Sequence, residues 1–107
     1  MLRIYDLVRS VIRRMAEIIR EIERHDADLA RQMRRALTSV ALNLREGSQS
    51  QGRNRNARYW NALGSMSEAL GGLDVAEDFG YVEGVDEELR RDIARIMAAL
   101  LRIIGRR

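Results

Sequence analysis

The sequence predicts an all-α protein, an antiparallel up-down-up-down four-helix bundle, on three observations. Four segments carry apolar residues at alternating spacings of three and four, which is the period of an amphipathic helix. No segment alternates polar and apolar residues as a half-buried strand does. The connections are short, and short connections make consecutive helices antiparallel neighbours. Without a repeat or linker, residues 1–107 are expected to form one domain.

The first predicted helix runs from about Ile4 to Arg24 and the second from about Asp28 to Glu46. The apolar stripe of the first consists of Ile4, Val8, Val11, Met15, Ile18 and Ile22. The stripe of the second consists of Met33, Leu37, Val40 and Leu44. Gly47 follows directly, and a glycine just past the last turn commonly ends a helix.

A polar, glycine-bounded segment, 47–55, predicts a loop before the third helix, which runs from about Asn56 to Phe79. The stripe of this helix consists of Tyr59, Leu63, Met66, Leu70 and Leu73. A second break, 80–86, ends at Asp86, a residue type suited to cap a helix N-terminus. The fourth helix carries Leu89, Ile93, Ile96, Leu100 and Ile103. It closes with Arg102, Arg106 and Arg107, cations that complement the negative end of the helix dipole.

The first and fourth helices carry more apolar surface than one bundle seam needs. At about 100° per residue, their apolar arcs span roughly 140° and roughly 160°. The additional residues are Leu7, Ile12 and Ile19 in the first helix and Met97, Leu101 and Ile104 in the fourth. Such a stripe either serves a generous core or is covered by another subunit, since large exposed apolar patches mark interfaces.

All 19 basic residues are arginine, and the charge is unevenly distributed. Residues 1–58 hold 13 Arg and 7 acidic residues, whereas residues 59–107 hold 6 Arg and 9 acidic residues. Arginine binds phosphate bidentately and stacks on bases, although a GC-rich genome produces the same bias. A basic middle and an acidic second half predict nucleic-acid contact, contact between subunits, or both.

Seven arginines are the candidate nucleic-acid-binding residues. They are Arg31, Arg34, Arg35 and Arg45 in the second helix and Arg53, Arg55 and Arg58 around the loop that follows it. The last three precede a helix N-terminus, where free amides and the positive end of the helix dipole favour anions. A solvated basic loop has the same composition. Beside them, Tyr59 is expected in the core, and Trp60 is expected to stack on a base or seal an interface.

Five polar residues flank the apolar stripes. They are Ser39, Asn43 and Glu46 of the second helix and Ser65 and Glu68 of the third. Polar side chains at a bundle seam hydrogen-bond to the facing helix and fix its register. We therefore expect a structural network and not a catalytic site, with Arg35 or Arg45 neutralising Glu46.

Three glycines, Gly64, Gly71 and Gly72, lie inside the predicted third helix, where each costs about 0.8–1.0 kcal/mol relative to alanine. Because Gly64 and Gly71 are seven residues apart and share a face, they predict the close approach of a neighbouring backbone.

Composition argues against enzymatic and metal chemistry. The chain has no cysteine, so thiolate metal sites and disulfides are excluded. His25 is the only histidine, and Ile22 stands where a bundle di-iron site needs glutamate. No phosphate-binding loop or serine elbow is recognisable. We therefore expect no metal, no cofactor and no enzymatic activity. The amphipathic N-terminal segment predicts neither a signal peptide nor a membrane span, and hence a cytoplasmic protein.

Two motifs resemble a known family. They are QMRRALTSVALNLREG at 32–47, and Ala62-Leu63-Gly64-Ser65 with Glu68, followed by Gly80-Tyr81-Val82. Both are similar to the bacterial four-helix-bundle family first noticed in open reading frames inside large-subunit ribosomal-RNA intervening sequences. That family is related to the accessory variability proteins of diversity-generating retroelements. The resemblance implies a ring-like homopentamer and allows an adaptor role toward a partner such as a reverse transcriptase.

The leading interpretation is an oligomer that binds structured RNA or DNA through its arginine-rich surface. The competing interpretation is a protein-interaction scaffold whose arginines serve subunit pairing. In that case the acidic run Glu83, Asp86, Glu87 and Glu88 would meet the basic face of a neighbour.

Overall fold

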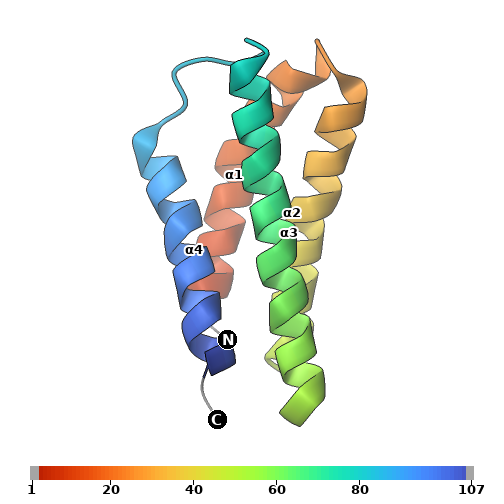
Figure 1. Cartoon of the computed structure of the whole chain (residues 1–107), viewed down its shortest axis with the longest axis vertical. Helices are drawn as coiled ribbons and strands as arrows, with labels where there is room; N and C mark the ends of the chain where they lie inside the picture. The colour runs from red at the N-terminus through yellow and green to blue at the C-terminus, as the bar shows by residue number, and fades with distance from the viewer. Residues whose placement is uncertain (1–2, 106–107) are drawn as a thin grey trace.

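A computed structural model describes residues 3–105, which form four helices and no strand. The helices are α1 (Arg3–Glu23), α2 (Ala27–Gly47), α3 (Gly52–Asp78) and α4 (Glu87–Gly105). Each is antiparallel to the next, so α1 begins and α4 ends where the α2–α3 turn lies (Figure 1). The predicted all-α four-helix bundle is confirmed. Arg106 and Arg107, which the sequence predicts to close the fourth helix, lie outside the described residues.

Aspartates cap two of the helices. The Asp26 carboxylate accepts a hydrogen bond from the backbone N–H of Leu29 at 3.0 Å, so α2 starts slightly earlier than predicted. Asp86 accepts in the same way from the N–H of Glu88 at 3.0 Å, as expected for the cap of α4. Each cap satisfies an amide that has no partner within its helix.

The third helix begins four residues earlier than the sequence predicts. The sequence predicts that Gly52 lies in a loop, but it is the first residue of α3 and has a φ of 62°. This left-handed backbone, which glycine adopts without steric cost, turns the chain from the extended Gln51 directly into the helix. As a result Arg53 and Arg55 lie in the first turn of α3 and not in a loop.

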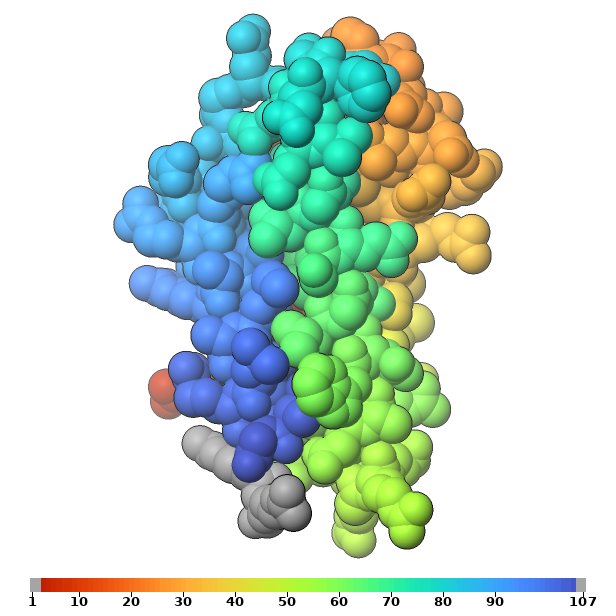
Figure 2. Space-filling view, in the orientation of Figure 1, coloured from red at the N-terminus to blue at the C-terminus, as the bar shows by residue number. Residues whose placement is uncertain are grey.

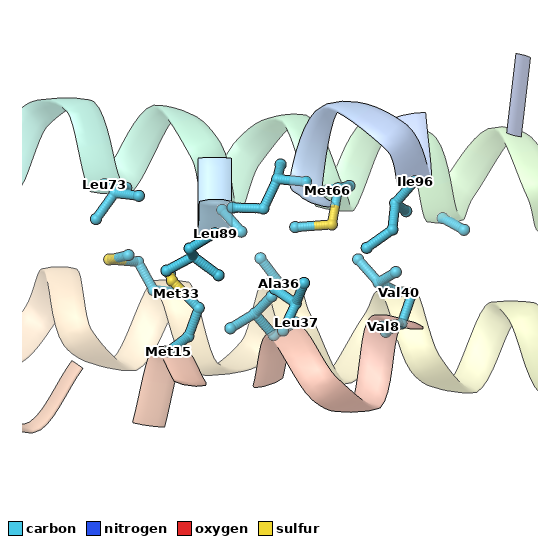
Figure 3. Packing of buried hydrophobic residues seen from close by; sticks show 14 of the residues in the cluster. Val8, Met15, Met33, Ala36, Leu37, Val40, Met66, Leu73, Leu89 and Ile96 are labelled. Carbon is cyan, nitrogen blue, oxygen red and sulfur yellow. The ribbon is translucent and has the colours of Figure 1, made fainter. Parts of the chain in front are cut away.

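Apolar side chains from all four helices fill the core. Figure 3 shows Val8 and Met15 of α1, Met33, Leu37 and Val40 of α2, Met66 and Leu73 of α3, and Leu89 and Ile96 of α4 pointing toward one another. Ile19, which the sequence placed outside the stripe, is 3% exposed, whereas Ile18 is only half-buried. The stripe of α1 therefore steps by four residues after Met15, because 3.6 residues per turn require both step lengths.

Most of the additional apolar surface is absorbed by the bundle itself. The half-buried residues packed against the core include Leu7, Ile12, Met97 and Ile104, together with three that were predicted within stripes, Leu63, Leu70 and Ile103. In α3, Ala62 and Ala69 are fully buried in place of Leu63 and Leu70, beside the predicted Tyr59, Met66 and Leu73. Leu101 is the exception, with 53% of its surface exposed.

Helices α2 and α3 pack most closely, and two glycines allow this. A Cβ atom on Gly47 would lie 2.7 Å from Cε1 of the buried Tyr59 ring, and one on Gly72 would lie 2.7 Å from Cγ of Met33. α2 ends at Gly47, as predicted, but Gly47 does not adopt a left-handed conformation, and glycine is required there by its close packing against Tyr59.

The other two glycines of α3 do not behave as predicted within the chain. A Cβ atom on Gly64 or Gly71 would meet nothing within 4 Å, so no described segment of this chain approaches that face. The close approach predicted for this pair is made by Gly72, which lies on the face toward α2.

A buried carboxylate joins α1 to α4. Asp92 is 6% exposed, and its Oδ2 accepts a hydrogen bond from Nη2 of Arg14 at 2.7 Å. Arg14 also donates to Oγ of Ser10 at 3.0 Å, and Arg95 donates to Oδ1 of Asp92 at 3.2 Å. These bonds satisfy both oxygens of the carboxylate, as a buried charge requires. The spacing of the apolar residues in the sequence does not predict this ion pair.

Replacing Gly47 with alanine should lower the free energy of unfolding by about 1–3 kcal/mol, because the new methyl group meets a rigid aromatic ring in a filled core. Urea denaturation should show a lower midpoint at an unchanged m value. The control is Gln32→Ala on the exposed face of α2, which meets no filled core and should change the free energy of unfolding by at most about 0.5 kcal/mol. Equal midpoints for Gly47→Ala and the parent protein would contradict the packing role.

Replacing Asp92 with alanine should cost about 1–3 kcal/mol of stability, because the partly buried guanidinium of Arg14 loses its acceptor. Arg95→Ala is the matched control and should cost at most about 1 kcal/mol, since the Arg95 side chain is 71% exposed. Thermal and urea denaturation measure both. Equal losses for the two variants would show that burial of the pair is unimportant.

Candidate nucleic-acid interface

The fold separates the charges of the protein along its long axis. Arginines gather at the end where α1 begins, α2 meets α3 and α4 ends (Figure 1). They are Arg3, Arg45, Arg53, Arg55, Arg58 and Arg102, which we call the basic end. The opposite end carries the acidic run Glu83, Asp86, Glu87 and Glu88 together with the carboxylates of the 24–26 connection and its flanks. The uneven charge of the sequence thus becomes an uneven charge in space.

The two candidate arginines nearest the acidic end are engaged in ion pairs. Arg31 pairs with Asp28 one turn earlier in α2. Arg34 reaches across to α1, where its Nη2 lies 2.7 Å from Oε1 of Glu23. Arg35, the next residue of α2, is exposed and makes no ion pair among residues 3–105.

At the basic end, two guanidiniums lie over aromatic rings. The Cζ atom of Arg45 is 5.8 Å from the ring centroid of Tyr5, and that of Arg55 is 5.3 Å from the ring centroid of Tyr59. Such contacts order the side chain and leave its N–H groups free to donate. Arg53 is exposed and forms no ion pair within the described range. These three side chains keep their charge available to an anion.

Arg58 has a different role from the one predicted. Its Nη2 lies 3.0 Å from Oε2 of Glu46, so Arg58 neutralises that carboxylate, and neither Arg35 nor Arg45 does so. Helical spacing along α2 limited the prediction to arginines on the same helix, whereas the actual partner comes from α3.

The same arginine joins a chain of hydrogen bonds across the α2–α3 seam. Ser65 Oγ donates to Ser39 Oγ at 2.8 Å, and Asn43 Nδ2 donates to the same hydroxyl at 3.0 Å and to the Ser39 carbonyl at 2.9 Å. Arg58 Nη1 in turn approaches Asn43 Oδ1 at 3.5 Å. Glu68 is exposed and makes no hydrogen bond among the described residues, so it stands outside this chain.

The α2–α3 seam is hollowed on its outer side. A groove of ≈ 500 Å³ is lined by Arg34, Arg35, Thr38, Ser39, Leu42, Asn43, Glu46 and Arg58. A smaller hollow of ≈ 280 Å³ continues it past Ser65 to Gln32 and Glu68, and shares Arg35 and Ser39 with it. Leu42 is 55% exposed in the groove, where every other lining residue is polar or charged.

Two basic-end residues were not among the seven candidates. Arg3 opens α1 and Arg102 lies in the last turn of α4, and the sequence interpretation assigned Arg102 to the helix dipole alone. Only the up-down topology brings these two arginines next to the α2–α3 turn. They were therefore recognisable only once the helices were arranged in space.

At the acidic end, an aromatic stack closes the bundle. The ring of Tyr81 is stacked on His25, with centroids 5.2 Å apart, and on Phe79, with centroids 5.3 Å apart. The Tyr81 hydroxyl donates to Oδ2 of Asp26 at 3.4 Å. Burial raises the pKa of Tyr81 above 10.0, and the negative charge of Asp26 raises it further. The Gly80-Tyr81-Val82 motif thus ties the α3–α4 connection to the α1–α2 connection.

Across residues 3–105, no three His, Asp or Glu side chains are grouped so that they can hold a metal ion. In the same part of the chain, no helix combines the length and the apolar character needed to cross a membrane.

The two motifs therefore have defined places in the fold: one forms the α2 side of the α2–α3 seam, and the other forms the α3 side and the closing stack. Residues 1–102 match the model of the 23S rRNA-intervening sequence protein family. The chain belongs to this family. No curated protein matches its sequence.

A solved structure shares the fold of this chain. It is a protein of unknown function from the S23 ribosomal protein family of Bacteroides thetaiotaomicron VPI-5482. The two structures superpose with a TM-score of 0.84 over 96% of this chain and 99% of the other, at 21% sequence identity. At this identity the likeness establishes the four-helix fold, and function has to be argued from the site.

Proposed function

We propose that this protein is a non-enzymatic accessory protein that binds structured RNA or DNA through its basic end. The observation that carries the proposal is the number of arginines there without a carboxylate partner among the described residues. Arg45 and Arg55 lie over aromatic rings, and Arg3, Arg53 and Arg102 form no ion pair within residues 3–105. Membership of a family named for ribosomal-RNA intervening sequences supports RNA as one ligand.

Binding of this kind recognises phosphate and shape more than sequence. Guanidiniums and the free amides at the start of α3 contact phosphate oxygens, which carry no sequence information directly. The affinity therefore depends on how many phosphates are neutralised and falls with salt concentration. Arg31 and Arg34, which lie nearer the acidic end, are paired with carboxylates and are therefore less available to such an end-on contact.

The double substitution Arg53→Ala/Arg55→Ala should weaken binding to a labelled duplex and make the slope of log affinity against log salt shallower by about 0.9 for each lost phosphate contact. Fluorescence anisotropy across a salt series measures both quantities. The charge-matched control is Arg13→Ala/Arg91→Ala, since both residues are exposed and lie away from the basic end. Equal losses in the two variants would show that net charge alone causes the binding and would contradict the proposal.

We also propose that the protein is a homo-oligomer, with the ring-like pentamer implied by the family resemblance as the expected form. The supporting features lie on the face formed by α3 and α4, which is turned toward the viewer in Figure 2. Trp60 and Leu101 are 55% and 53% exposed on these two helices, although both are large apolar side chains. On α3, Gly64 and Gly71 leave open space along the same outward side as Trp60. A second copy packed here would cover the apolar side chains and use the glycines for close approach.

Light scattering at micromolar concentration should therefore give a mass several times 12.3 kDa, with five copies as the expected value. Trp60→Glu should reduce this mass, because it places a charge in the proposed interface. Val75→Glu, about four turns further along α3, tests how far along the helix the contact extends. A monomeric parent protein would contradict the assembly.

A protein-interaction scaffold is the second candidate function, and the exposed Trp60 and Leu101 are the observations that favour it. In this case the arginines of the basic end pair with the acidic end of a neighbour. The Arg53→Ala/Arg55→Ala variant separates the two functions, because it would then disrupt the oligomer while the parent protein binds no nucleic acid.

A further inference from the structure

We propose that the groove between α2 and α3 binds a single-stranded segment of nucleic acid, with an unpaired base over Leu42 and phosphates beside Arg58 and Arg35. The inference rests on the proposed function, since it assumes that the basic end attracts a nucleic acid. It goes further by naming the form of the ligand and a second contact surface, which continues from the basic end along the side of the bundle.

The groove combines an apolar surface with groups that bind phosphate. Leu42 is exposed in its middle, and a flat base placed there would cover apolar surface that now contacts water. Arg35 lines one part of the groove without an ion pair in the described range, and Arg58 lines the other. Guanidinium groups beside a base also stack on it or hydrogen-bond to its edge.

The dimensions of the groove favour one strand over a duplex. Packed helices have axes about 8–10 Å apart, so the furrow between them is narrower than a double helix. Along α2, Arg35 and Glu46 are separated by about 16 Å at 1.5 Å per residue. At about 3.4 Å per nucleotide, this length corresponds to roughly four or five stacked nucleotides.

The polar wall of the groove is held in place before any ligand arrives. Asn43 is fixed by its two hydrogen bonds to Ser39, and the Ser39 hydroxyl also accepts from Ser65. Because Ser39 accepts both of these bonds, its own proton is free to be donated to a base edge. Side chains ordered in this way lose little conformational entropy when a ligand binds.

Glu46 opposes binding at the mouth of the groove nearest the basic end. Its carboxylate oxygen Oε2 forms an ion pair with Nη2 of Arg58 at 3.0 Å. The same carboxylate repels a phosphate that approaches Arg58. The side chain of Arg58 is 39% exposed and that of Glu46 is 54% exposed, so the pair is in contact with solvent and weak enough to open. A strand entering from the basic end would exchange its phosphate for Glu46, and Glu46 therefore lowers the affinity of the groove.

The test uses fluorescence anisotropy with three labelled probes: a 12-nucleotide single-stranded RNA, the DNA strand of the same sequence, and the matched RNA duplex. The parent protein is compared with Leu42→Glu, Glu46→Gln and the control Glu83→Gln, which removes one acidic charge at the far end. Circular dichroism and light scattering establish that each variant keeps its fold and its assembly.

We expect the parent protein to bind both single strands more tightly than the duplex. Leu42→Glu should weaken single-strand binding roughly tenfold or more, as the loss of a base-stacking contact does, and leave duplex binding little changed. Glu46→Gln should strengthen single-strand binding roughly two- to fivefold and steepen its salt slope by about 0.7, because Arg58 becomes available to a phosphate. Glu83→Gln should change the single-strand affinity less than Glu46→Gln does.

Three results would count against the inference, and they are distinguishable. If the duplex binds at least as tightly as the single strands and Leu42→Glu affects neither, the groove is not used and the basic end alone binds nucleic acid. If no probe binds at low salt, the proposed function fails together with the inference. If Glu46→Gln and Glu83→Gln strengthen binding equally, the effect comes from net charge and the role of Glu46 is wrong.

Discussion

Glycine and serine stand at the points where α2 and α3 contact each other, and this close approach determines what lies on the outside of the seam. Gly47 receives the ring of Tyr59, Gly72 receives Met33, and the hydroxyls of Ser39 and Ser65 are in hydrogen-bonding contact between these two points. Backbones this close bring Arg58 of α3 within reach of Asn43 and Glu46 of α2. The groove, its polar wall and its ion pair all follow from the small residues beneath them.

The helices themselves could be predicted from the sequence because their apolar periods are long and uninterrupted. The ends of the helices were harder to predict. Gly52, for example, is a residue type typical of loops, but its backbone conformation starts a helix. The choice between Ile18 and Ile19 also could not be made, because a helical stripe accepts steps of both three and four residues.

The partners that side chains find on other helices could not be predicted from the sequence, for a different reason. The period shows which face of a helix is buried, but it does not show which helix lies opposite or at what height. Glu46 was therefore matched to arginines on its own helix, although its partner is Arg58. The Arg14–Asp92 ion pair, which joins residues 78 positions apart, was missed altogether. Ser39 and Ser65, in contrast, were identified because both are polar residues that flank the apolar stripes of their helices.

The separation of charge along a bundle 43 Å long and about half as wide also gives the molecule a direction. A polyanion at a distance attracts one end and repels the other, so its field turns the protein before any contact is made. Rotation about a symmetry axis preserves direction along that axis. In a closed ring with the bundles aligned along it, every basic end would therefore point to the same side. Such a ring would have two chemically different faces, one positive and one negative, and only one of them would meet a nucleic acid.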